Sequence, residues 1–465
     1  MDILREGLGV TAIPGLARPG WVSGETSPRG MGVWTGLLSR KAAARGKTDL
    51  VIAEDWTDAL TAYAERLHAA AGPDHHVVSA LGAWLLVALC APLAETEARA
   101  ELAEVLGADP MEAAQFATEL LSQPHPMVAA GAGLWVAPAV TTPVMERWRD
   151  GLPPRVTTGD IPTQEAIDAW ANEHTLGLID RFPVQIDPDL VCLLATALAT
   201  KVSWDVPFEL VDAAALAPSP WAASLNRVLR SPRRDPRHRQ YVAESDRAGT
   251  VGVHLAGARG GLLVGSVIAA DPEVPAADVL AAAHSIVTTE ARAPNSVARR
   301  SLFDLPLGHG AIWSITEEEV ETKANDGREE VVTSVLPAWT AETTVDLAGD
   351  DLGLPTAARV IKQALGLTNL TYEAKQVALA RYTAVGFEAA AVTVLAIATS
   401  APRLRPGHRR EATLRFGHPF AVVAVASDDL EVPPRDRVST PWLGLPVFSA
   451  WIAHLDGMAR RDEAD

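Results

Sequence analysis

Cysteine is almost absent from this chain. Its 465 residues include only Cys90 and Cys192, which are too few for a disulfide scaffold and are more typical of buried apolar thiols than of a redox or catalytic pair. Aromatic residues are also sparse, at 5%, although hydrophobic residues as a whole make up 48% and charged residues 21%. This composition excludes a disordered or low-complexity protein and indicates a folded chain with a large core.

Basic residues are in deficit. The 40 Lys and Arg residues stand against 58 Asp and Glu residues, and the formal net charge is −18. Because such a charge repels phosphate backbones, we expect no nucleic-acid partner. The exception is the run Arg227–Arg239, which holds six arginines and could make a weak contact with a polyanion.

Long hydrophobic runs are missing as well. The longest apolar stretch, Ala80–Leu93, is too short to cross a bilayer. Residues 1–50 contain no continuous apolar core followed by a small-residue cleavage site, so we see no signal peptide. We therefore expect no membrane association and a cytoplasmic location, with an extracellular location left open through an unrecognised export route.

The sequence also lacks the common signatures of enzymes. It contains no phosphate-binding loop, no serine nucleophile elbow and no dinucleotide fingerprint. Its 12 histidines show no metal-ligand spacing, since His75 and His76 are adjacent rather than four residues apart. We expect a protein that is not an enzyme and that needs neither a metal nor another cofactor.

Apolar periodicity begins only after residue 49. Residues 1–49 are rich in proline and glycine and are predicted to be a poorly structured extension, followed by one domain over 50–455 and a charged tail over 456–465. Helical spacing predicts helices over 56–67, 79–90, 95–106 and 163–182. Short apolar runs predict strands over 130–137, 190–199, 376–382 and 421–426.

Several segments, in this order, carry a resemblance to a known family. They are Glu95–Gly107, Ile167–Ile179, Leu193–Phe208, Leu336–Trp339 and Phe416–Phe420. Each is a weak match, but the ordered set resembles the serpin family over residues 50–455, as a divergent, bacterial-type member. The resemblance implies an α+β serpin fold, with a large, mostly antiparallel main sheet, smaller sheets, surrounding helices and an exposed reactive loop near the C-terminus.

The stretch Gly386-Phe-Glu-Ala-Ala-Ala-Val-Thr393 resembles the hinge of that reactive loop. In inhibitory serpins a peptidase cuts the loop, and the freed segment then enters the main sheet as an added strand while the peptidase is still attached. Insertion requires small side chains, no proline and alternating burial, and no proline intervenes before Pro402. The hinge residues are Gly386, Phe387, Glu388, Ala389, Ala390, Ala391, Val392 and Thr393.

The resemblance implies that residues 384–415 are the bait and that 386–399 are the insertable strand. The usual hinge length places the cut at Ser400–Ala401, which suits an elastase- or subtilisin-like peptidase. A shifted register would make Arg403 or Arg405 the specificity residue and a trypsin-like peptidase the target. Within 386–399, Phe387, Ala389, Ala391, Thr393, Leu395 and Ile397 share one face and could be buried together.

Several positions depart from the family pattern. Phe387 stands where a small Thr or Ser is usual, and a buried aromatic there costs about 1–3 kcal/mol by overpacking. In the region where the sheet would open, Ser79 lies in an altered motif and Thr196 and Gln376 replace Asn and His, whereas Trp204 is retained.

Two hypotheses follow. The first is a monomeric suicide-substrate inhibitor of a serine or cysteine endopeptidase. The alternative, suggested by the altered hinge and sheet-opening residues, is a non-inhibitory binding or carrier protein with the same fold.

Overall fold

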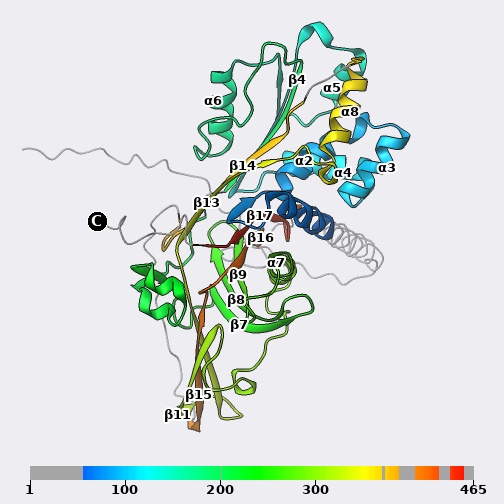
Figure 1. Ribbon diagram of the computed structural model, residues 1–465. Coiled ribbons are helices and arrows are strands. Elements are labelled where there is room, and N and C mark those ends of the chain that lie inside the picture. Colours follow the sequence, from blue (N-terminus) through cyan, green and yellow to red (C-terminus); the bar gives the residue numbers. More distant parts are fainter. Residues whose placement is uncertain (1–55, 201, 369–371, 387–403, 429–439, 455–465) are drawn as a thin grey trace, which may run out of the picture. The chain divides into compact units, whose positions relative to one another are not determined.

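The computed structural model describes residues 56–200, 202–368, 372–386, 404–428 and 440–454. These residues all belong to one compact unit, Val51–Asp465 (Figure 1). The extension over 1–49 and the tail over 456–465 lie outside the described residues. None of the described helices is long and apolar enough to span a bilayer.

The predicted helices form where helical spacing and capping residues coincide. Ser79 caps the apolar helix α2 by accepting a hydrogen bond from the backbone N–H of Gly82. Gly107, with φ of 70°, ends α3 in the left-handed conformation that glycine adopts without strain. The helices cover residues 56–71, α2 Ala80–Cys90, α3 Thr96–Leu106, α4 Pro110–Ser122, α5 Pro143–Asp150, α6 Gln164–His174, α7 Ala276–Arg292 and α8 Leu354–Ala364.

The prediction of a helix over 163–182 was too long. Thr163 caps α6, but the helix ends at His174. Leu176 and Gly177 then adopt positive φ angles of 57° and 74°, which an α-helix cannot accommodate. The apolar residues that continued the helical pattern belong instead to an irregular segment that packs against β4.

Two six-stranded sheets form much of the β-structure. The first has the order β1-β17-β16-β9-β8-β7, with β1 His76–Val78, β7 His238–Ser245, β8 Gly249–Ala258, β9 Leu262–Ala269, β16 Phe420–Ala426 and β17 Pro446–Ile452. The second has the order β10-β11-β15-β12-β6-β5, with β5 Glu209–Asp212, β6 Arg227–Arg230, β10 Gly308–His309, β11 Trp313–Thr322, β12 Arg328–Leu336 and β15 Arg405–Arg415.

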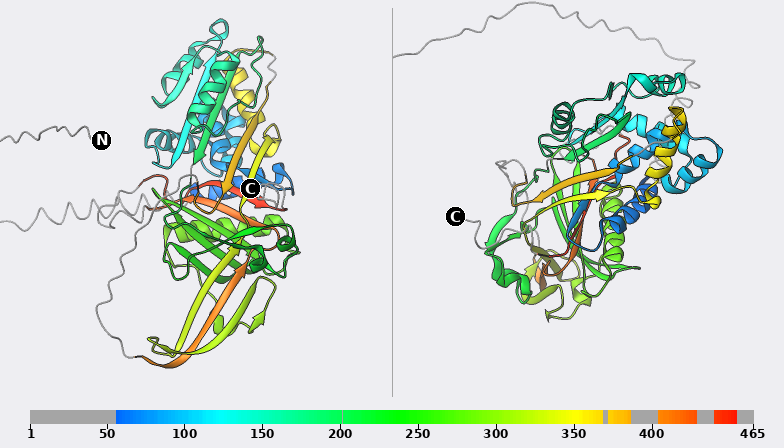
Figure 2. Two further views of the ribbon diagram at one scale, coloured as in Figure 1. Left: turned by 90° about the vertical axis from the view of Figure 1, so that its left-hand side faces the viewer. Right: turned by 45° about the horizontal axis from the view of Figure 1, so that its top comes forward.

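The expected main sheet is present as two halves. One half has the order β3-β2-β4, with β2 Val128–Val136, β3 Val156–Gly159 and β4 Cys192–Thr200; the other pairs β13 Trp339–Asp346 with β14 Lys375–Tyr382. In Figure 1 and Figure 2 these long strands run beside α2 and α8.

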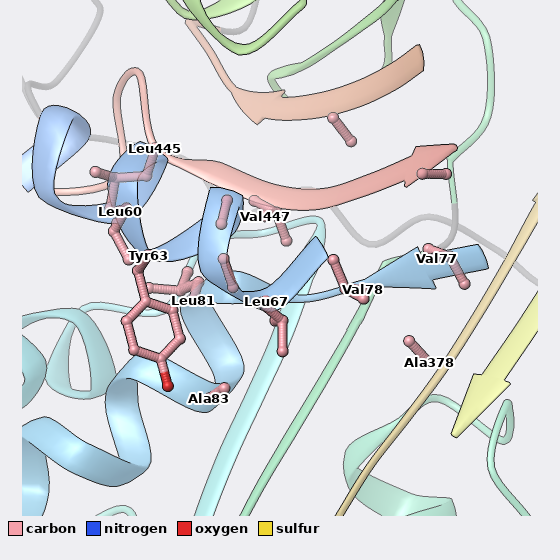
Figure 3. Packing of buried hydrophobic residues seen from close by; sticks show 14 of the residues in the cluster. Leu60, Tyr63, Leu67, Val77, Val78, Leu81, Ala83, Ala378, Leu445 and Val447 are labelled. Atoms are coloured by element: carbon pink, nitrogen blue, oxygen red, sulfur yellow. The ribbon is translucent and has the colours of Figure 1, made fainter. Parts of the chain in front are cut away.

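The core lies beneath this split sheet. Figure 3 shows Leu60, Tyr63 and Leu67 of the helix over 56–71 gathered with Leu81 of α2 and Val447 of β17. All five side chains are buried. The Tyr63 hydroxyl is satisfied because it donates to the carbonyl oxygen of Leu352, 2.9 Å away. Ala378 of β14 belongs to the same cluster, so one half of the split sheet rests directly on this core.

Candidate functional site

The two halves of the main sheet face each other across a gap. In the described part of the chain, β4 pairs with β2 and β14 pairs with β13, and no ladder joins β4 to β14. Each strand therefore presents one edge of backbone N–H and C=O groups to the gap.

The two edges run in the same direction. Thr196 of β4 and Gln376 of β14 both bind the start of α2. Six residues after Gln376, the ring of Tyr382 lies 4.8 Å from that of Trp204, which follows β4. A strand lying between them and returning from the end of β14 would be antiparallel to both neighbours.

A cavity of about 480 Å³ lies between the halves. Its walls are largely apolar and come from β4, β14, α2, α8 and the segment over 170–190, which includes the end of α6. The burial of β4 alternates, with Leu193, Ala195 and Ala197 buried on the α6 side and the intervening residues half-buried. The strand predicted over 190–199 is therefore present as β4, buried on the α6 side and half-buried on the other. Lining residues include Leu86, Cys90, Leu194, Leu198, Ile361 and Val377.

Three of the predicted sheet-opening residues meet at the start of α2. Gln376 accepts from the backbone N–H of Ser79 at 2.9 Å and donates to its carbonyl oxygen at 2.8 Å. Thr196 donates to the carbonyl oxygen of Gly82 at 2.7 Å. The two replacements thus bind the helix beneath the gap from opposite edges, and α2 bridges the strands that would have to part.

Trp204, the fourth predicted residue, lies at the other end of the gap. Its indole Nε1–H donates to the carbonyl oxygen of Thr383 at 2.8 Å. The backbone N–H of Phe208 donates to the carbonyl oxygen of Ala384, also at 2.8 Å. Ser203 forms an isolated antiparallel bridge with Gly386. The segment over 203–208 therefore holds the chain where it leaves β14.

Gly386 is required by its conformation. Its φ is 79°, and a Cβ atom there would lie 2.1 Å from the carbonyl oxygen of Val202, a contact that no side chain could avoid. The hydroxyl of Thr383 donates to the carbonyl oxygen of Gly386 and accepts from its N–H. Sequence reasoning placed the hinge at Gly386 but missed Thr383, which closes the turn before it.

A buried aromatic and histidine cluster supports the segment over 203–208. The ring of Phe208 lies 4.8 Å from that of His238 and 5.3 Å from that of His254. The two histidines share a hydrogen bond of 3.1 Å between His238 Nδ1 and His254 Nε2. Burial lowers the pKa of both, and for His254 the neighbouring His238 lowers the pKa further. The sequence analysis assigned no role to either residue.

The far end of the predicted bait is a strand. β15 lies between β11, with which it is antiparallel, and β12, with which it is parallel. The prediction of a loop extending to residue 415 was therefore wrong beyond Leu404, because the Arg-rich stretch pairs with a Glu-rich strand. Arg410 binds Glu317 at 2.7 Å, and Arg409 binds Glu318 at 2.9 Å.

The basic run Arg227–Arg239 is also partly neutralised. Arg233, Arg234 and Arg239 are ion-paired with Glu411, Glu329 and Glu290 respectively. These pairs leave a weaker positive field for a polyanion than the six arginines alone suggest.

The cysteines are close to the gap. Both line the cavity and are free thiols. Burial raises the pKa of Cys192 to about 12 and raises that of Cys90, so neither thiol is ionised at neutral pH. Among the described residues, no three His, Cys, Asp or Glu side chains form a group that could hold a metal ion.

Hinge positions 387–393 and the candidate cleavage residues Ser400, Ala401 and Arg403 lie outside the described residues. Arg405 is described: it is the first residue of β15 and pairs with Thr322.

Comparison with known proteins identifies the fold. No family model matches the chain, and no curated protein matches it. Many solved structures do. The structure of Serpin48 from the insect Tenebrio molitor, described as a highly specific serpin, has a TM-score of 0.53 at 14% identity and covers 86% of this chain and 98% of its own. Human thyroxine-binding globulin in complex with its thyroxine ligand gives the same TM-score, identity and shares of both chains.

A third solved structure extends the likeness to the full length of its chain. Native protease nexin-1 with heparin has a TM-score of 0.54 at 13% identity, over 87% of this chain and 100% of that one. The matches thus include proteins whose described ligands and specificities differ. This chain has the serpin fold, with the α+β architecture that its sequence motifs predicted.

Proposed function

We propose that this protein inhibits a serine or cysteine endopeptidase by inserting its cleaved loop into the gap between β4 and β14. The observation that carries the proposal is the split main sheet, with the hinge Gly386 attached at the mouth of the gap. The two edges, which no ladder joins among the described residues, could offer hydrogen bonds along the length of an entering strand, and main-chain pairing of this kind supplies affinity in strand addition.

We take the Ser203–Gly386 bridge as the starting point of the entering strand. If that antiparallel register continues along β4, Ala389 would lie opposite Thr200, Thr393 opposite Thr196 and Ile397 opposite Cys192. The strand would then end level with the first residue of β4.

The same register decides which side chains are buried. Residues opposite each other in an antiparallel pair point to the same side. Leu194 and Leu198 pack against the main core and Thr196 binds α2, so their partners Leu395, Ala391 and Thr393 would point toward that core. These belong to the set of alternate residues that the sequence identified as fit for burial.

The position of β15 supports a requirement for cleavage before insertion. The hinge end of β14 lies beside the start of β13, where Tyr382 pairs with Trp339. β12 comes just before β13 in the chain, and its first residue, Arg328, lies at the far end from the hinge. β15 begins near that far end, where His408 pairs with Arg328. With Ile397 opposite Cys192, the intact chain would have to return from Cys192 past the end of β4 to the level of Ser203, about 36 Å, before reaching Arg405. Residues 398–404 span at most about 28 Å.

The position of β15 also bears on the cleavage site. A peptidase binds an extended segment on both sides of the bond that it cuts, and Arg405 is held between strands. Ser400–Ala401 lies further from β15 than the bond after Arg403 does. The account therefore favours Ser400–Ala401 and a peptidase that accepts small residues.

Two features favour the alternative of a non-inhibitory carrier. In the proposed register Phe387 would be the first side chain to enter, opposite Val202 and beside the Trp204–Tyr382 pair. An additional aromatic ring there would cost about 1–3 kcal/mol through overpacking. The cavity of about 480 Å³ is also within the size range of small-molecule sites.

One assay distinguishes the two functions. The protein is incubated with subtilisin-, elastase- and trypsin-like peptidases, and inhibition requires a covalent complex that survives denaturant and a higher melting temperature after cleavage. Cleavage that yields neither the complex nor stabilisation would leave the carrier function. Phe387→Thr is the matched variant: if it creates complex formation, the phenylalanine was the obstacle.

A further inference from the structure

A chain of hydrogen bonds connects the hinge to two buried histidines. The segment over 203–208 holds Thr383, Ala384 and Gly386 through three separate contacts. The same segment is held in turn by His238, whose Nε2 lies 2.7 Å from the carbonyl oxygen of Val206. The hinge is thus attached to the sheet of β7 and β8 through one short loop.

The hydrogen-bond geometry fixes which ring nitrogens of His238 and His254 carry a proton. His238 Nε2 faces a carbonyl oxygen and must donate, so in the neutral ring Nδ1 is the acceptor. His254 Nε2 must then donate to His238 Nδ1, which leaves His254 Nδ1 without a proton. That atom is buried and has no hydrogen-bond partner in the part of the chain that the structure describes.

Neither histidine can gain a proton without either breaking the hydrogen bond between the two rings or leaving a buried donor unsatisfied. A proton on His238 Nδ1 would face the N–H of His254. A proton on His254 Nδ1 would be a buried donor without an acceptor, on a side chain that is 0% exposed. An unsatisfied buried charge costs several kcal/mol, so the packing around Phe208 has to open when either ring is protonated.

We propose that the His238–His254 pair is an acid-sensitive latch on the hinge: proton uptake separates the two rings, loosens residues 203–208 and releases residues 383–386 from the end of β4. The two histidines act as positioning residues because they reach the hinge only through the segment over 203–208.

The charged and titratable groups around the pair leave this direction unchanged. Asp235, which precedes β7, raises the pKa of His238, but burial outweighs it. His254 faces Gln240 and Ser266 on its neighbouring strands. Asp205 lies on the latched segment, where its backbone N–H binds the carbonyl oxygen of Gly257, and Tyr382 reaches Phe208 from β14.

The latch would regulate the same site as the proposed function. The latch depends on the proposed function only for its expected effect, because faster loop insertion in acid requires that the loop inserts at all. The release itself can be measured on uncleaved protein without a peptidase, so failure of peptidase trapping and failure of the latch are separate outcomes.

The test is amide hydrogen exchange on the full-length protein at pH 7.5 and pH 5.0, corrected for the intrinsic exchange rate. We expect peptides covering 203–208 and 383–386 to lose at least about tenfold more of their protection at pH 5.0 than β16 loses. His254→Gln keeps an N–H donor toward His238 and can also accept, so it should abolish the difference. His284→Leu removes another buried histidine, on α7, and should leave the difference intact.

Equal protection at both pH values would overturn the latch. So would a loss that is uniform across the protein, or one that persists in His254→Gln. If that variant does not fold, the wild-type comparison of the hinge peptides with β16 still decides, because only a local loss agrees with the proposal.

Discussion

His284 is expected to make the protein unstable in acid. Its side chain is 1% exposed, and neither ring nitrogen has a hydrogen-bond partner among the described residues. Burial lowers its pKa from 6.5 to about 4. The native state therefore favours the neutral ring, while the unfolded chain takes up a proton below about pH 6.5.

The sign and size of the change in unfolding free energy with pH follow from proton linkage. The depressed pKa gives stability that is fully present above pH 6.5 and is lost as the pH falls toward 4. Over this interval of about 2.5 pH units, each unit contributes about 1.4 kcal/mol, so His284 alone should cost about 3 kcal/mol. His68, whose ring centroid lies 6.1 Å from that of His284, has its pKa lowered mainly by burial and adds to the loss.

The perturbation is His284→Leu, which has no titrating group and leaves no unpaired ring nitrogen. Urea unfolding at pH 7 and pH 4 should show an acid-induced loss of free energy about 3 kcal/mol smaller in the variant than in the wild type. His309→Gln, at an exposed position of β10, is the control and should match the wild type. An equal acid loss in His284→Leu and the wild type would refute the reasoning.

Three further substitutions test the contacts around the gap by denaturant unfolding of the uncleaved protein. Gln376→Leu removes both hydrogen bonds to the Ser79 backbone and should cost about 2 kcal/mol; an unchanged unfolding midpoint would mean that these bonds do not hold the gap's lower end. Gly386→Ala should cost at least about 2 kcal/mol, because the residue has positive φ and its Cβ would meet the carbonyl oxygen of Val202; wild-type stability would contradict the hinge geometry. Arg410→Gln loses bonds to the carbonyl oxygens of Leu302 and Leu305 and should cost about 2–3 kcal/mol, whereas Arg227→Gln, on an exposed arginine, should change little.

Local patterns predicted the elements around the gap well. α2, α3 and β14 follow from apolar spacing and from residues such as Ser79 and Gly107, whose chemistry acts within one turn of chain. α6 was predicted too long because apolar spacing continues through Leu176, and spacing alone does not reveal a positive φ there.

Contacts between distant segments could not be predicted in this way. β15 contains proline, glycine and several arginines and resembled a loop, but Glu317 and Glu318 lie about 90 residues earlier in the chain and pair with its arginines. The complementary runs of glutamate and arginine were the available signal. The hinge at Gly386 was recognisable from its motif, whereas its attachment through Thr383 and Phe208 depends on how the segment over 203–208 folds back.

The proposed register can be tested with one engineered thiol. Ile397→Cys, in a Cys90→Ala background, should form a disulfide with native Cys192 under mild oxidation after the loop is cut at 400–401, because opposite residues in an antiparallel pair have Cα atoms about 4.5–5.5 Å apart. Ala396→Cys is the control, since its side chain would face the other side of the sheet. The account predicts the crosslink in cleaved Ile397→Cys alone; its absence there, or equal crosslinking of the uncleaved protein or of Ala396→Cys, would contradict insertion between β4 and β14.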